Sequence, residues 1–159
     1  MAEFKTNVMR TLDKKKIEYI PHQYPVTDGT PIDGVSVASY INKDASCVYK
    51  TLVCQGASKK YYVFVIPVAD QLDLKKCAKA AGEKSVEMIK QKDLLPLTGY
   101  VHGGCSPIGM KKPFKTFFQQ DVESLETVTL SAGKIGYQIE IKPETLLNFI
   151  GAETAELTC

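Results

Sequence analysis

Residues 46–68 read SCVYKTLVCQGASKKYYVFVIPV, and this stretch predicts a β-hairpin at the centre of the fold. Residues 46–55 alternate in polarity and are rich in β-branched and aromatic side chains, a pattern typical of strands. Residues 61–68 are almost uninterruptedly apolar, as expected of a strand that is buried on both faces. Between them, residues 56–60 contain glycine and serine, which favour a turn.

Helices and further strands flank this hairpin. Helical spacing of apolar residues, with capping residues at several ends, predicts helices over residues 5–16, 35–42, 73–81, 85–95 and 143–150. Further strands are predicted over residues 115–118, 127–131 and 138–141, and loops over residues 24–34 and 98–113. Because no regular βαβ repeat occurs, we expect the α/β (α+β) class, with a mixed, barrel-like β-sheet flanked by helices.

Length and composition indicate one folded domain. The chain has 159 residues, of which 44% are apolar and 24% are charged, values close to those of ordinary globular proteins. No linker or internal repeat divides it, so we expect a single domain over residues 1–159. The formal net charge is only +2, so any surface for nucleic acid must be a local patch. No helix-turn-helix pattern or dense basic helix is present, and we expect no DNA partner.

The sequence gives little support for membrane, metal or disulfide chemistry. Its longest apolar run, residues 63–68, is far shorter than the roughly 20 residues of a membrane-spanning helix, and residues 1–10 do not resemble an export signal. We therefore expect a cytoplasmic protein without a membrane partner. The five cysteines form no C-x-x-C pair and only two histidines are present, which disfavours disulfides and a zinc site. We expect no metal and no organic cofactor.

Lys50 is the first residue that points to chemistry. Lysine is depleted from central strands, yet Lys50 lies within the predicted strand, and alternation places it on the same face as Val48 and Leu52. It can belong to an edge strand, with its ammonium reaching solvent along the aliphatic stem. Alternatively, the ammonium points into a pocket, where it would orient or polarise a substrate.

A glycine-rich loop is the second such feature. Residues 99–112 read GYVHGGCSPIGMKK, and such a loop is either an ordinary turn or a backbone that approaches a ligand closely. In the second case, amides near Gly103 and Gly104 would face a developing oxyanion. Three lysines at the end of the loop could receive phosphates: Lys111, Lys112 and Lys115.

Familiar enzyme motifs are absent from the sequence. It contains no P-loop, no dinucleotide-binding motif and no nucleophile elbow. Cys105 with His102 is the only pair that could form a nucleophile–base dyad. Their spacing of three residues within a glycine-rich loop is not diagnostic of such a dyad.

Several long blocks, in the right order, carry a family resemblance. The blocks are KTNVMRTL (5–12), VYKTLV (48–53), PVADQLDLKKCAKAAGEKSVEM (67–88), TGYVHGGCSPIGMKK (98–112) and SAGKIG (131–136). Over nearly its whole length the chain resembles the YbaK family of bacterial aminoacyl-tRNA deacylases, particularly the Cys-tRNA(Pro) deacylases. The resemblance implies a mixed, barrel-like sheet flanked by helices. It also implies a free-standing editing enzyme that cleaves cysteine from a tRNA wrongly charged by prolyl-tRNA synthetase.

The resemblance further implies roles for particular residues. The family's essential lysine falls on Lys50, and its G-x-x-x-P motif falls on residues 103–107. We therefore expect Lys50, Gly103 and Gly104 to be catalytic. The expected substrate-binding residues are Tyr24, Thr51, Cys105, Ser106, Pro107, Gly109 and Ser131, and the expected tRNA-binding residues are Lys111, Lys112 and Lys115.

Three positions depart from the family's pattern. Asp33 replaces a phenylalanine of the substrate pocket, and Ile135 and Gln138 replace an arginine and an aspartate after the SAGK turn. The amino acid that is removed therefore stays open between cysteine and alanine or another small residue. A non-catalytic module that only binds aminoacyl-tRNA is the more distant alternative.

For the reaction, we expect Lys50 to hold the aminoacyl group or the terminal ribose while loop amides face the carbonyl oxygen. The attacking group is either water or, as the resemblance to cysteine-specific members implies, the thiol of the substrate. The expected partners are aminoacylated tRNA(Pro) and prolyl-tRNA synthetase. The synthetase would help to hold the tRNA, because the basic patch of this chain is small.

Overall fold

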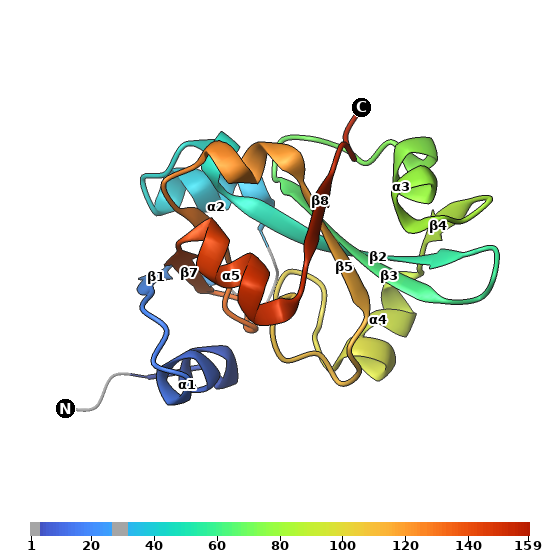
Figure 1. The fold of residues 1–159 in the computed structure, drawn as a ribbon. Coiled ribbons are helices and arrows are strands. Elements are labelled where there is room, and N and C mark those ends of the chain that lie inside the picture. The colour runs from blue at the N-terminus through green and yellow to red at the C-terminus, as the bar shows by residue number, and fades with distance from the viewer. Residues whose placement is uncertain (1–3, 27–31) are drawn as a thin grey trace.

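The computed structural model describes residues 4–26 and 32–159, which form two β-sheets with helices around them (Figure 1). The strands are β1 (Ile20–Gln23), β2 (Tyr49–Gly56), β3 (Tyr61–Pro67), β4 (Val86–Met88), β5 (Lys115–Gln119), β6 (Val128–Ser131), β7 (Tyr137–Ile141) and β8 (Glu153–Ala155). The helices are α1 (Asn7–Lys14), α2 (Gly34–Tyr40), α3 (Leu74–Ala81), α4 (Gln91–Thr98) and α5 (Pro143–Ile150), with 3₁₀ turns η1 (Ala45–Cys47) and η2 (Gln120–Ser124). The predicted fold class is confirmed.

The predicted hairpin forms the middle of the larger sheet. Strands β2 and β3 pair antiparallel, from Tyr49 opposite Pro67 to Gln55 opposite Tyr61. Strands β5 and β8 add in parallel beyond β3, whereas β4 adds antiparallel to β2, which gives the order β4-β2-β3-β5-β8. The sheet is therefore mixed, as predicted. Its middle strand β3 is buried over nearly its whole length, which explains its unbroken apolar run.

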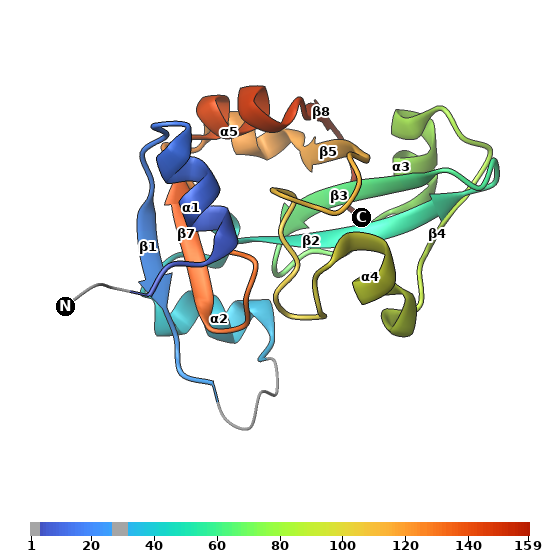
Figure 2. The same ribbon diagram turned by 90° about the horizontal axis from the view of Figure 1, so that it is seen from below.

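The smaller sheet joins the larger one beside the start of β2 (Figure 2). Strands β1, β7 and β6 form an antiparallel sheet in that order, and Val48, just before β2, bridges Thr129 of β6 in parallel. At the other end of β2, residues 54–56 pair with β4. In the described part of the chain, residues 50–52 consequently have no strand neighbour on that side of β2.

Capping residues define the helix ends. Thr6, Asp33 and Asp73 accept hydrogen bonds from first-turn amides of α1, α2 and α3, as expected of these residue types. Gly82 after α3 and Gly151 after α5 adopt the left-handed conformation that ends many helices. Helices α1, α2, α3 and α5 therefore lie within two residues of their predicted bounds.

The prediction of a helix over residues 85–95 was wrong in its first half. Residues 86–88 form β4, and their pairing with the end of β2 outweighs their helical spacing. The helix α4 begins only at Gln91. The pairing of residues 86–88 with β2 decides that they form a strand. Such pairing with a distant strand is not visible in the sequence of the short segment itself.

Two short strands were not predicted. Strand β1 contains Pro21, which weakens a strand pattern but is tolerated here because β1 lies at the edge of the smaller sheet. Strand β8 has only three residues and pairs in parallel with β5. Of the predicted loop over residues 24–34, residues 27–31 lie outside the described residues, and Gly34 already belongs to α2.

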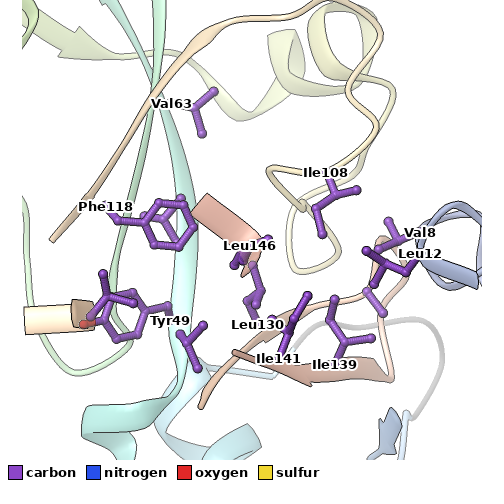
Figure 3. Close-up of a cluster of buried hydrophobic side chains, with 14 of the residues drawn as sticks. Val8, Leu12, Tyr49, Val63, Ile108, Phe118, Leu130, Ile139, Ile141 and Leu146 are labelled. Carbon is purple, nitrogen blue, oxygen red and sulfur yellow. The ribbon is translucent and has the colours of Figure 1, made fainter. Parts of the chain in front are cut away.

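The largest cluster of buried apolar side chains draws on both sheets, with α1 and α5 packed against it (Figure 3). Its fully buried members include Leu12 of α1, Phe118 of β5, Leu130 of β6 and Leu146 of α5. Ile108 from the glycine-rich loop belongs to the same cluster and is also fully buried. The loop is therefore anchored to the core by its own side chain, which fixes the residues just before it.

Candidate active site

A cavity of about 300 Å³ lies where β2 has no strand neighbour. It is walled by the start of β2, the start of α2, the smaller sheet and the glycine-rich loop. The lining residues are Tyr24, Ile32, Asp33, Gly34, Val37, Val48, Tyr49, Lys50, Thr51, Leu52, Val68, Leu94, His102, Gly103, Cys105, Ser131 and Gln138. Six residues predicted for the site thus come together here: Tyr24, Lys50, Thr51, Gly103, Cys105 and Ser131.

The main chain of Thr51 points away from β3, toward the unpaired edge of β2. The main-chain N–H and C=O groups of the even-numbered residues of β2 form hydrogen bonds with β3. Val48, just before β2, sets this pattern, because its carbonyl accepts a hydrogen bond from the amide of Val68 (2.8 Å). Because bonding sides alternate in an antiparallel ladder, the N–H and C=O of Thr51 lie on the opposite side. Val53 uses that side to accept a hydrogen bond from the amide of Ile89 (3.1 Å). The peptide groups of Thr51 remain available for a ligand.

The side chain of Lys50 lines the same cavity. It is half-buried, and within residues 4–26 and 32–159 its ammonium makes no ion pair with a carboxylate. Burial lowers the pKa of Lys50, while the charge of Asp70 opposes that shift. The sequence left two interpretations of Lys50 open: a position on an edge strand, or an ammonium that points into a pocket. Both apply, because the side of β2 that has no strand neighbour in the described residues borders the cavity. The ammonium is therefore available to a ligand atom that carries negative charge.

The glycine-rich loop contributes Gly103 and Cys105 to the wall. Gly103 has a φ of +88°, a conformation that favours glycine. Gly104 packs against the β6–β7 turn, where an added Cβ would lie 3.0 Å from the amide nitrogen of Ile135. Burial raises the pKa of the Cys105 thiol to about 12, so this thiol stays protonated at neutral pH.

Four predicted loop residues do not line this cavity: Gly104, which packs against the β6–β7 turn instead, and Ser106, Pro107 and Gly109. Ser106 is fully buried, and its Oγ accepts a hydrogen bond from the amide of Ile108 (3.2 Å). Pro107, between them, is buried as well. Gly109 is exposed, has a φ of +73° and lines a different cavity. These residues shape the loop, while Gly103 and Cys105 form its inner surface.

Tyr24 and Ser131 reach the cavity from the smaller sheet. Tyr24 is buried, and its amide donates to the carbonyl of Gly136 (3.0 Å). The Oγ of Ser131 accepts a hydrogen bond from the amide of Gly133 (3.1 Å). Both bonds hold the SAGKIG turn, residues 131–136, in place beside the cavity.

Three residues of the wall hold buried polar atoms that have no hydrogen-bond partner among the described residues: Oη of Tyr49, Oγ1 of Thr51 and Oε1 of Gln138. An unpaired buried polar atom costs about 1–3 kcal/mol, and such atoms call for an explanation in a native structure. Sequence reasoning treated Gln138 only as a departure from a family pattern. Its burial in the wall is the signal that marks it as part of the site, and burial is not visible in the sequence.

Asp33 lies in the wall, but its carboxylate is already engaged. It caps α2 and accepts hydrogen bonds from the amide and the hydroxyl of Ser36 (2.9 and 2.8 Å). These hydrogen bonds lower the pKa of Asp33. Ile135, another departure from the family's pattern, lies in the turn behind Gly104 and does not line the cavity.

The three predicted tRNA-binding lysines do not gather at this cavity. Lys111 and Lys112 are exposed where the glycine-rich loop ends. Lys115 starts β5 opposite Tyr62, at the end of β3 away from the cavity, and its ammonium lies 3.6 Å from the carboxylate of Glu153. The structure therefore separates Lys115 from the other two.

A buried ionic cluster supports the smaller sheet beneath the cavity. The carboxylate of Glu140, two residues after Gln138 on β7, accepts hydrogen bonds from Thr127 Oγ1 (2.6 Å), Lys43 Nζ (2.8 Å) and His22 Nε2 (2.9 Å). Burial raises the pKa of Glu140, but these hydrogen bonds outweigh it and lower the pKa to about 2. The cluster ties β1, β7 and the segment after α2 together.

Glu140→Gln is expected to lower the free energy of unfolding by about 3 kcal/mol at pH 7. A carboxylate whose pKa falls from 4.5 to about 2 on folding stabilises the folded state above pH 4.5, and this contribution is lost as the pH falls through about 2. Urea unfolding at pH 7 and pH 3 measures the difference between wild type and variant. It should shrink by more than half at pH 3, and an equal difference at both pH values would contradict the assignment.

The described residues hold no cluster of three or more His, Cys, Asp or Glu side chains that could bind a metal ion. All five cysteines are free thiols. In the same part of the chain, the helices are all too short or too polar to cross a membrane.

Comparison with known proteins identifies the protein family to which this fold belongs. Residues 33–149 match the model of the aminoacyl-tRNA editing domain. The match includes the Lys50 strand, the glycine-rich loop and the SAGKIG turn, and it spans most of the chain. The chain belongs to the aminoacyl-tRNA editing domain family, and the resemblance seen in the sequence is confirmed.

A curated relative narrows this class. The chain is 42% identical over 154 residues to EbsC of Enterococcus faecalis, a protein provisionally named a Cys-tRNA(Pro)/Cys-tRNA(Cys) deacylase, and the match covers 97% of this chain and 93% of EbsC. A crystal structure described provisionally as a trans-editing enzyme for prolyl-tRNA synthetase superposes with a TM-score of 0.82 at 21% identity, over 99% of both chains. The hypothetical protein APE2540 superposes with a TM-score of 0.85 at 21% identity, over 96% of this chain and 99% of that one. At this identity the two structures establish the fold.

Proposed function

We propose that this protein is a trans-editing deacylase that cleaves cysteine from mischarged Cys-tRNA(Pro) and releases the free tRNA. The observation that carries the proposal is that the Lys50 ammonium, the Gly103 loop and the peptide groups of Thr51 meet at one cavity. In residues 4–26 and 32–159, that ammonium has no carboxylate partner and those peptide groups have no strand partner. The name of the relative EbsC points to the same substrate, with Cys-tRNA(Cys) as a second one. A volume of about 300 Å³ lies at the lower end of ligand pockets and suits a small aminoacyl group.

The chemistry needs little from the protein, because an aminoacyl ester is already activated. The site has to position the carbonyl group and stabilise the negative charge that develops on its oxygen. Lys50 supplies a cation that binds the aminoacyl group or the terminal ribose. The main chain near Gly103 and Thr51 supplies peptide groups that bind the carbonyl oxygen or the substrate amine.

The attacking group comes from the substrate or from solvent. The Cys105 thiol stays protonated at neutral pH. His102 is exposed, and within the described residues it makes no hydrogen bond with this thiol. If the substrate thiol attacks its own carbonyl carbon, a C–S bond forms, the C–O bond to the ribose breaks and a proton passes to the released ribose hydroxyl. If water attacks, the products are free cysteine and tRNA.

Cys105→Ala is expected to lower kcat/KM for Cys-tRNA(Pro) by less than about tenfold, because the thiol only fills part of the wall. Iodoacetamide at neutral pH should also leave the activity of the wild type intact. Alkylation requires the thiolate, and the Cys105 thiol stays protonated at this pH. Single-turnover deacylation of radiolabelled Cys-tRNA(Pro) measures both effects. A complete loss of activity in a normally folded variant would restore the Cys105–His102 dyad.

A panel of aminoacyl-tRNAs tests the proposed function. We expect Cys-tRNA(Pro) to be cleaved faster than Ala-tRNA(Pro) and Ser-tRNA(Pro), with Cys-tRNA(Cys) as the comparison for tRNA identity. Faster cleavage of Ala-tRNA(Pro) would assign the site to alanine. Binding without turnover of any member would identify a non-catalytic module.

Prolyl-tRNA synthetase is the proposed partner of this editor, which acts in the cytoplasm where tRNA is charged. The net charge of +2 gives the chain little general attraction for tRNA. Adding the synthetase to the panel should therefore raise the rate at low enzyme concentration. Tight, salt-insensitive binding of tRNA by the protein alone would contradict this need for a partner.

A further inference from the structure

A second cavity, of about 380 Å³, adjoins the same loop and turn. It is bounded by the start of α1, by loop positions 98–100, 109 and 111, and by residues 132–134 of the SAGKIG turn. Among the described residues, its lining includes no aspartate or glutamate but four cationic side chains: Lys5, Arg10, Lys111 and Lys134. The described part of the lining therefore carries an excess of positive charge, although the chain as a whole is almost neutral.

Three of these cations have no carboxylate partner in residues 4–26 and 32–159. Arg10 and Lys111 donate to neutral oxygen atoms (3.2 and 3.3 Å), and the Lys134 ammonium lies 4.6 Å from the ring centroid of Phe4. Lys5 differs, because it is paired at 2.6 Å with an aspartate of α1. An anion that enters the cavity therefore meets charge that no carboxylate of the described residues neutralises.

The main chain adds hydrogen-bond donors to this surface. Helix α1 begins here at Asn7, with Thr6 as its cap and no acidic residue in its first turn. The amides of Asn7 and Val8 have no partner within the helix, and the helix dipole favours anions at this end. Gly133 has a φ of +91°, and an added Cβ there would lie only 2.9 Å from Cγ2 of Val8. The turn and the helix therefore pack closely and hold the cations on a fixed frame.

The two cavities are neighbours across the SAGKIG turn. Ser131 lines the first cavity and Lys134 the second, and three residues of chain span at most about 11 Å. The glycine-rich loop is shared in the same way, with Gly103 in the first wall and Lys111 in the second. A nucleic acid whose terminal ester lies at Lys50 would carry its last phosphates across this turn.

We propose that the second cavity binds the phosphodiester backbone of the single-stranded 3′ end of the tRNA while the aminoacyl ester occupies the first. This step rests on the proposed function, because the ester and the phosphates belong to one substrate. It assigns the phosphates to Arg10, Lys111 and Lys134. Lys115 is left out, because it lies at the other end of β3 beside a glutamate.

The double variant Arg10→Gln/Lys134→Gln tests this assignment. It is expected to weaken the binding of uncharged tRNA(Pro) by about tenfold or more at low salt, and to reduce the slope of log Kd against log salt by about 1 to 2. Fluorescence anisotropy over a salt series measures both quantities. The matched control Lys75→Gln/Lys79→Gln removes the same charge from exposed positions of α3 and should change neither. The conservative variant Arg10→Lys/Lys134→Arg should bind like the wild type.

Deacylation separates this assignment from the proposed function. In the double variant, kcat/KM for Cys-tRNA(Pro) should fall with affinity, whereas kcat/KM for a cysteinyl ester of adenosine, which lacks phosphates, should not change. If the wild type cleaves no aminoacyl-tRNA, the proposed function fails, while the anisotropy series still tests the phosphate site.

Inorganic phosphate distinguishes the two sources of the ligand. Millimolar phosphate should displace tRNA no more than chloride at equal ionic strength. Stronger displacement would identify a site for a small free anion and overturn the assignment. Wild-type affinity and salt slope in the double variant would overturn it as well.

Discussion

Lys50→Ala is expected to lower kcat/KM for Cys-tRNA(Pro) by about 100-fold or more while the protein stays folded. The expected loss is that of removing one charge-stabilising group from an active site. Within residues 4–26 and 32–159 the Lys50 ammonium has no carboxylate partner, and Lys50 is the only lysine or arginine of those residues that lines the first cavity. In the described part of the wall, no other lysine or arginine can therefore supply its charge.

Folding should tolerate this change, which makes the result interpretable. The pKa of Lys50 is lowered by burial, so the folded state disfavours the charged form, and loss of the amine removes an unfavourable interaction. Thermal unfolding should show a Tm equal to or above that of the wild type. Lys60→Ala, at an exposed position after the hairpin turn, is the control and should keep full activity.

The pH dependence gives a second readout for Lys50. If the ammonium is the active form, the wild-type rate falls as the pH rises toward a pKa below 10.5, because the charge is lost there. Single-turnover rates, corrected for spontaneous ester hydrolysis, should show this decline in the wild type and not in Lys50→Ala. A variant with the wild-type kcat/KM would remove Lys50 from the mechanism.

The hairpin and most helices could be predicted because their signals are local. The apolar run of β3, the caps Asp33 and Asp73, and the terminating Gly151 each act within a few residues of the element they define. Lys50 was also visible in the sequence, since a charge inside an apolar strand conflicts with its surroundings. Such a conflict within a regular pattern marks a candidate site residue, and the structure places Lys50 in a cavity wall.

The rest depends on pairing across the chain. Strand β4 forms where residues 86–88 pair with the end of β2. Farther along the same side of β2, no strand of the described residues pairs with residues 50–52, which leaves the main chain of Thr51 without a strand partner. Neither the strand conformation of β4 nor the missing partner of Thr51 can be seen in the local sequence of these segments. The basic set after the glycine-rich loop shows the same limit: Lys115 lies at the far end of β3, while Arg10 and Lys134, distant in sequence, lie near Lys111. Charge clusters of this kind require the fold.

Gly104→Val is expected to lower kcat/KM for Cys-tRNA(Pro) by about 100-fold. An added Cβ at Gly104 would lie 3.0 Å from the nitrogen of Ile135 and 3.2 Å from the carbonyl carbon of Lys134. Both are main-chain atoms, held in a turn that is packed against α1, so they cannot retreat like the end of a flexible side chain. The loop must move instead, and a displacement of about 1 Å at an active site costs about that much in rate.

The same substitution should lower the free energy of unfolding by about 1–3 kcal/mol, the usual cost of overpacking. The loss of rate therefore has to be separated from the loss of stability.

The control variant Gly82→Ala provides that separation. Gly82 has a φ of +72° and nothing within 4 Å of an added Cβ, so alanine there costs about 1–2 kcal/mol of backbone strain at the end of α3, away from the cavity. Comparable destabilisation with an unchanged kcat/KM in Gly82→Ala, against the large loss in Gly104→Val, would locate the effect in the contact between loop and turn. Equal rates in the two variants would mean that Gly103 does not need its exact position, and the role of the loop amides would have to be abandoned.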